Sequence, residues 1–79
     1  MSPTVHREGP YRFHFYSHDR LEPAHVHVER DDCSAKFWLN PVSLAYNLGY
    51  SEFEARLVQR IVEANRVRLI DAWNRYFPP

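Results

Sequence analysis

The stretch EPAHVHVER contains two histidines that alternate with valines, and these imidazoles are the side chains best placed for chemistry. Alternation with a period of two predicts a β-strand, on which His25 and His27 project side by side from one face. An HxH pair on a strand can supply two imidazole ligands to zinc or a similar divalent metal ion. His14 on a neighbouring strand would be a third ligand, and Glu29 or Asp19 would bind the ion or orient an imidazole.

The same face also fits metal-free chemistry on phosphodiesters. Histidine exchanges protons near neutral pH, and arginine or lysine stabilises the charge that develops on a phosphate. Flat aromatic side chains stack on unpaired bases, as in the recognition of single-stranded RNA. The candidate catalytic residues of such a ribonuclease-type site are His14, His25 and His27. The candidate residues for binding RNA or a partner are Arg12, Tyr16, Lys36 and Trp38.

A docking surface without catalysis is the third interpretation of this face. Histidine and tyrosine tolerate half-burial, and Trp38 beside His25 would form a cross-strand packing pair. Such a face would receive a partner protein, a second copy of the chain, or the segment 41–48. The sequence leaves the metal site, the ribonuclease-type site and the docking surface open as alternatives.

Four antiparallel strands are predicted to position these side chains. The turn at residues 31–32 sets Val26 opposite Phe37 and His25 opposite Trp38. Apolar pairs and polar pairs therefore fall on separate faces of the sheet. The predicted strands are residues 3–7, 11–17, 24–30 and 34–40.

The first hairpin gives the same separation of faces. A three-residue turn at residues 8–10 would set Val5 opposite Phe13 and His6 opposite Arg12. The predicted core face carries Val5, Phe13, Phe15, Val26, Val28, Phe37 and Leu39. The opposite, histidine-bearing face carries His6, Arg12, His14, Tyr16, His25, His27, Glu29, Lys36 and Trp38.

The second half of the chain has helical spacing. Residues 41–50 are predicted to be a connecting segment with a short turn of helix that ends at Gly49. Ser51 and Glu54 form a capping box, and an amphipathic helix is predicted from there over residues 51–77. A straight helix of this length would be roughly 39 Å long. We therefore expect either a bend near residues 64–66 or a homodimer formed through the far end of the helix.

These elements predict a single α+β domain over residues 1–79. Its antiparallel sheet has about four strands at residues 3–40, followed by a long or kinked helix on one sheet face. The 10 basic and 10 acidic residues balance, so the chain is not a globally basic nucleic-acid binder. One cysteine excludes an internal disulfide, and no apolar run is long enough for a membrane helix. We expect a cytoplasmic protein.

The segments YRFHFYS, EPAHVHVE, AKFWLNPV and S..E......IVEAN...L..AW..YF together resemble the small prokaryotic proteins grouped as domain of unknown function 4160. The resemblance covers nearly the whole chain. In that family the loop before HVHV often reads SNEGNEPPH. Here Ser17, Pro23, His25 and His27 match the family pattern, whereas His18 replaces an asparagine and Ala24 replaces a proline. The resemblance implies a component of a toxin–antitoxin pair, acting on RNA or binding a small cognate antitoxin-like protein.

Overall fold

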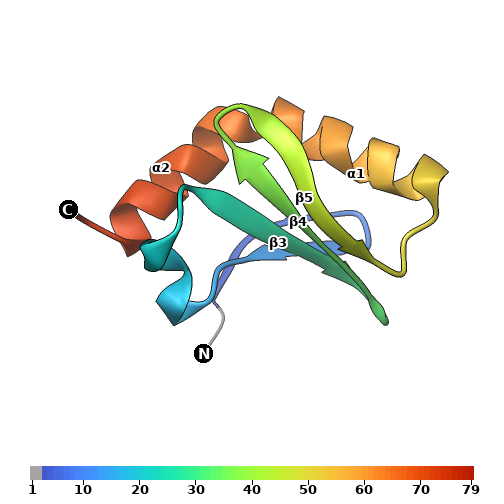
Figure 1. Cartoon of the computed structure of the whole chain (residues 1–79), viewed down its shortest axis with the longest axis horizontal. Helices are drawn as coiled ribbons and strands as arrows, with labels where there is room; N and C mark the ends of the chain where they lie inside the picture. Colours follow the sequence, from blue (N-terminus) through green and yellow to red (C-terminus); the bar gives the residue numbers. More distant parts are fainter. Residues whose placement is uncertain (1–2) are drawn as a thin grey trace.

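A five-stranded antiparallel sheet carries two helices on one of its faces in this computed structural model, which describes residues 3–79 (Figure 1). The elements, in chain order, are β1 (Thr4–Glu8), β2 (Tyr11–His14), the 3-10 helix η1 (Ser17–Leu21), β3 (His25–Arg30), β4 (Cys33–Leu39), β5 (Val42–Leu48), α1 (Glu52–Ala64) and α2 (Arg66–Tyr76). The α+β class and the antiparallel sheet are confirmed, but the sheet has five strands rather than about four. Within residues 3–79 no helix is long and apolar enough to cross a membrane.

Strand β5 occupies the segment that the sequence analysis assigns to a connector. That assignment of residues 41–50 is wrong, because β5 pairs along β4 and places Tyr46 opposite Lys36. The stretch VSLAYNL alternates as a strand does. Leu44 and Leu48, however, also have the i, i+4 spacing of a helix, so the local pattern is ambiguous. Pairing decides between the two, since β5 satisfies the main-chain groups that β4 would otherwise expose.

The β3–β4 hairpin has the predicted register. Val26 lies opposite Phe37 and His25 lies opposite Trp38, with residues 31–32 in the turn. Asp31 adopts a φ of 51°, which the short polar side chain of aspartate tolerates. The histidines and valines of β3 therefore face opposite sides of the sheet, as predicted.

The β1–β2 hairpin is shifted by one residue from the predicted register. His6, rather than Val5, lies opposite Phe13, because the turn has two residues and Gly9 adopts a φ of 56°. An irregularity between Thr4 and His6 absorbs the extra residue of β1. The rings of His6 and Phe13 lie 5.1 Å apart, centroid to centroid. The prediction that His6 belongs to the histidine-bearing face is therefore wrong.

Asn65 divides the predicted long helix into α1 and α2. The structure thus has the expected bend near residues 64–66, and at this bend the chain forms two separate helices. The Asn65 side-chain amide donates hydrogen bonds to the Ile61 carbonyl (2.9 Å) and to Glu8 Oε1 (3.1 Å). The bend returns α2 to the sheet and buries Leu69 and Trp73. These apolar side chains of the far half of the predicted helix are therefore covered within the chain itself.

The core lies between the sheet and the two helices. Of the predicted core face, only Val5 is partly buried, and the other members are fully buried. The helices complete the core with Ala55, Val58, Val62, Leu69 and Trp73. This layer fixes the orientation of β3 and so determines which side its histidines face.

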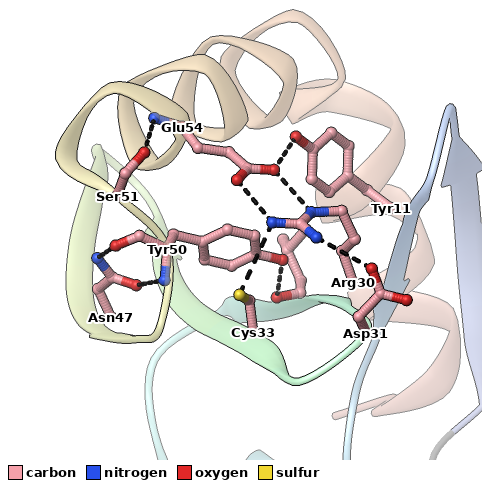
Figure 2. Close-up of polar contacts among 9 residues, drawn as sticks. Tyr11, Arg30, Asp31, Cys33, Asn47, Tyr50, Ser51 and Glu54 are labelled. Carbon is pink, nitrogen blue, oxygen red and sulfur yellow. Dashed lines mark hydrogen bonds and ion pairs between the residues drawn. The ribbon is translucent and has the colours of Figure 1, made fainter.

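A polar network joins the start of α1 to the end of β3 (Figure 2). The Ser51 hydroxyl accepts a hydrogen bond from the Glu54 N–H (3.1 Å), so the predicted N-terminal cap is confirmed. The Glu54 carboxylate does not reach back to Ser51. It instead accepts two hydrogen bonds from the Arg30 guanidinium (2.7 Å each) and one from the Tyr11 hydroxyl (2.6 Å). A bidentate contact of this kind is among the stronger side-chain hydrogen bonds.

We expect Glu54→Gln to lower the free energy of unfolding at pH 7 and to flatten its decline in acid. Hydrogen bonds from Arg30 and Tyr11 hold the pKa of Glu54 below the ordinary 4.5. The carboxylate therefore stabilises the fold above pH 4.5, and this stability is lost as the pH falls through the lower pKa of the folded state. Urea unfolding between pH 3 and pH 7 measures the effect. The control Glu52→Gln removes only an exposed contact to Arg56 and should change stability much less, so equal effects would contradict the prediction.

Candidate functional site

Asp19 lies between the two imidazoles of β3. Helix η1 folds back against β3, and the Tyr16 N–H donates a hydrogen bond to Asp19 Oδ2 (2.7 Å). Asp19 Oδ1 is 3.1 Å from His25 Nε2, and Oδ2 is 3.0 Å from His27 Nε2. All three side chains are buried, and their ligand atoms lie within 4.8 Å of one another. The structure therefore brings both predicted metal ligands onto one buried carboxylate.

The hydrogen bonds of His25 determine which of its nitrogens carries the proton. Nδ1 lies 2.9 Å from the Pro23 carbonyl oxygen, which can only accept, so Nδ1–H is the donor. A neutral His25 then has its lone pair on Nε2. This atom is buried and has no hydrogen-bond partner among residues 3–79, although Asp19 Oδ1 is 3.1 Å away. Two buried electron-pair donors thus face each other, and a cation between them, either a proton on Nε2 or a metal ion, would stabilise this arrangement.

His27 contacts Asp19 on one side and β5 on the other. Its Nε2–H donates to Asp19 Oδ2, and its Nδ1 is 3.5 Å from the Tyr46 hydroxyl. Burial lowers the pKa of His27 in spite of the nearby carboxylate. Burial raises the pKa of Asp19, but the hydrogen bond from the Tyr16 N–H opposes it, and that pKa lies below its ordinary value. A carboxylate beside a neutral imidazole is a donor set suited to zinc.

A cavity of about 330 Å³ opens beside this cluster. Asp19 and His27 form part of its wall, whereas His25 lies behind them. Its lining comes from η1, β3, β4, β5 and the residues next to η1. The lining residues are Tyr16, His18, Asp19, Leu21, Glu22, His27, Lys36 and Tyr46.

His14, the predicted third imidazole, lies next to the cluster but outside it. Its ring stacks on that of His27, with centroids 5.5 Å apart and 24° between the planes. Both of its ring nitrogens are buried and lack a hydrogen-bond partner in the described part of the chain, and burial lowers its pKa to about 4. The nearest carboxylate oxygen, Glu29 Oε2, is 4.0 Å from His14 Nε2. The third ligand atom beside those of His25 and His27 therefore comes from Asp19 and not from His14.

The four predicted RNA- or partner-binding residues do not form one group. Tyr16 and Lys36 line the cavity beside the cluster. Arg12 forms an ion pair with Glu29, and Trp38 lines a separate cavity of about 370 Å³ near the β4–β5 turn. The structure thus brings two of the four, Tyr16 and Lys36, together with His27.

Four cavity residues are absent from the sequence-based prediction of the site: His18, Leu21, Glu22 and Tyr46. Tyr46 could have been found from the alternation in VSLAYNL, which identifies β5. His18 departs from the family pattern, yet its ring stacks on Tyr16 with 11° between the planes. No local signal in the sequence brings Glu22 to Lys36, because that contact depends on how η1 folds back.

A family model described as "Domain of unknown function (DUF4160)" matches residues 11–74. The chain belongs to this family. The DUF4160 match confirms the resemblance seen in the sequence, and it includes the whole Asp19–His25–His27 cluster and the cavity beside it. No curated protein and no solved structure matches the chain.

Proposed function

We propose that this protein is a metal-binding module that holds one divalent ion of the zinc type on Asp19, His25 and His27. The observation that carries the proposal is the unpartnered Nε2 of His25, which faces a buried carboxylate oxygen at 3.1 Å. A cation between the two atoms would satisfy both lone pairs. Two imidazoles and one carboxylate are a common ligand set for zinc.

The spacing of the ligand atoms supports an ion of this size. Metal–nitrogen distances of about 2.0–2.1 Å place neighbouring ligands of a tetrahedral ion about 3.3 Å apart. The carboxylate–imidazole distances, 3.1 Å to His25 and 3.0 Å to His27, are slightly shorter. The two distances end on different oxygens of Asp19, and the ligand atoms lie within 4.8 Å of one another, so the side chains would shift to bind one ion.

The hydrogen bonds that orient the three ligand side chains are of the kind found around metal sites. A ligating histidine normally donates its second N–H to a carbonyl or carboxylate, which fixes the orientation of the ring. The Nδ1–H of His25 already makes this contact with Pro23, and the Tyr16 N–H holds the carboxylate of Asp19. Tyr46 is the neighbour of His27 Nδ1. The cluster is therefore oriented by main-chain and side-chain contacts on every ligand.

Three protein ligands leave one position of a tetrahedral ion open. Asp19 and His27 line the cavity, so we expect that position to face it. Open positions of this kind distinguish catalytic zinc sites from structural ones, which have four protein ligands. A bound ion would supply a Lewis acid and a water molecule of lowered pKa. The chain's own residues would orient the ligands and shape the cavity.

Metal titration tests the proposal directly. We expect the purified apo-protein to bind one Zn²⁺ or Co²⁺ per chain, as measured by calorimetry and by the visible absorbance of Co²⁺. Zinc at 100 times its Kd should stabilise the fold by about 2.7 kcal/mol, because the ion binds the native state. The His18→Ala control should keep both effects, since this exposed imidazole lies outside the ligand set. Absence of stoichiometric binding would overturn the proposal.

A second candidate function is the toxin–antitoxin-like role, in which this side of the sheet contacts RNA or a cognate antitoxin-like protein, with or without ribonuclease-type catalysis. Exposed aromatic rings beside Lys36 favour it. Of the predicted catalytic histidines, His14 and His25 are buried away from the cavity, so His27 is the one that a ligand there would reach. Slowed growth on expression, relieved by the protein encoded next to it, is the result that this role requires.

A further inference from the structure

We infer that the cavity beside the proposed metal centre binds a nucleotide, with the phosphate at the open position of the ion and the base against the tyrosines. The inference rests on the proposed function, because it uses the ion held by Asp19, His25 and His27. It adds the chemical class of the ligand, which follows from three features of the cavity: its cation, its aromatic walls and its size.

Lys36 provides the cation. His27, Lys36 and Tyr46 lie opposite one another on β3, β4 and β5, so their side chains form a row across the sheet. The Lys36 ammonium is held over the ring of Trp38, 4.6 Å from its centroid, and is paired with Glu22. It is therefore a fixed charge on the cavity wall rather than a mobile surface lysine.

With a divalent metal ion bound, the charges around the cavity favour an anionic ligand. A divalent ion together with Lys36 would outweigh the carboxylates of Asp19 and Glu22, the acidic residues that line the cavity. Glu22 is half-exposed and is held there by Lys36, so an incoming phosphate can replace it and release it to solvent. Phosphate oxygens suit both a divalent ion and a lysine ammonium.

Aromatic rings form another part of the wall, next to Lys36. The side chains of Tyr16 and Tyr46 are 39% and 41% exposed and both line the cavity. His18 extends this surface, because its ring lies nearly parallel to that of Tyr16 with centroids 5.8 Å apart. Exposed flat rings beside a cation are the elements with which proteins bind unstacked bases.

The size of the cavity separates a nucleotide from smaller anions. Ligand cavities of about 300–1,000 Å³ hold small organic molecules. The cavity of about 330 Å³ is at the lower end of this range. Inorganic phosphate would leave most of it and all of the aromatic surface unused, whereas one nucleotide would use both.

Calorimetry on the zinc-loaded protein with uridine monophosphate, inorganic phosphate and uridine tests the inference. We expect the monophosphate to bind at least tenfold more tightly than either fragment, and removal of zinc to weaken it at least tenfold. Lys36→Gln should weaken the monophosphate about tenfold with zinc affinity unchanged. Glu22→Gln should strengthen it, because a competitor for Lys36 is lost. The control Arg60→Gln removes an exposed helix charge and should change neither affinity.

The outcomes separate this inference from the proposed function. If zinc binds but the monophosphate binds no more tightly than inorganic phosphate, the nucleotide inference is overturned and the metal centre stands. If zinc does not bind, both are overturned. An oligouridylate of five nucleotides identifies the source of the nucleotide. If it binds more tightly than the monophosphate, the source is an RNA strand. If the two bind equally, the ligand is a free nucleotide, and both results support the inference.

Discussion

The Asp19→Asn variant is expected to lose zinc affinity by more than about a hundredfold and to stay folded without metal. Loss of a contact that only orients a ligand typically lowers metal affinity about 10–100-fold, and loss of a charged ligand should lower it more. Asparagine keeps the shape of the side chain and one oxygen, which can still accept from the Tyr16 N–H and from His27. Its amide N–H can donate to the unpartnered His25 Nε2. The apo-variant should therefore be at least as stable as the apo-protein.

This result separates a metal centre from an ion pair. If the cation between Asp19 and His25 is a proton on the imidazole, the substitution removes a buried ion pair and should lower the melting temperature of the apo-protein. If it is a metal ion, the substitution abolishes only the increase in melting temperature that zinc causes. The measurements are zinc calorimetry and thermal unfolding with and without zinc. Glu22→Gln is the matched control for zinc binding, because it neutralises a nearby carboxylate that lies outside the ligand cluster.

Phe37→Ala is expected to lower the free energy of unfolding by about 3–5 kcal/mol. The Phe37 side chain is fully buried on β4, opposite Val26, where the sheet contacts the helices. Its loss removes buried apolar surface and leaves a cavity. Small domains have only about 5–15 kcal/mol of stability, so much of the variant should be unfolded well below the melting temperature of the wild type. Urea unfolding at 25 °C measures the difference.

Phe53→Ala is the matched control for this prediction. The Phe53 side chain is 79% exposed at the start of α1, so the same substitution there should change stability by no more than about 0.5 kcal/mol. A similar loss in both variants would contradict the described core. If Phe37→Ala lowers the free energy of unfolding only slightly, the sheet and helices do not pack through β4.

Short-range patterns determined most of the fold. Alternation in β3 and β4, with the two residues between them, fixed the register that pairs Val26 with Phe37, since a slip of one residue would expose the core side of both strands. In β1 the pattern is weaker, and Gly9 allowed a tighter turn that moved His6 by one position. In residues 42–48 strand and helix spacing coexist. Only pairing with the edge of β4 decided in favour of β5.

The candidate site also has a part that the sequence determined and a part that only the tertiary structure decided. The sequence by itself determined that His25 and His27 share one face of a strand, because side chains two residues apart on a strand must do so. It did not determine which of Asp19, Glu29 and His14 completes the cluster. Tertiary structure decided this when η1 folded back, buried the carboxylate of Asp19 between the imidazoles and placed the Pro23 carbonyl on His25 Nδ1. Such contacts depend on the path of a loop between two strands, which no periodic pattern encodes.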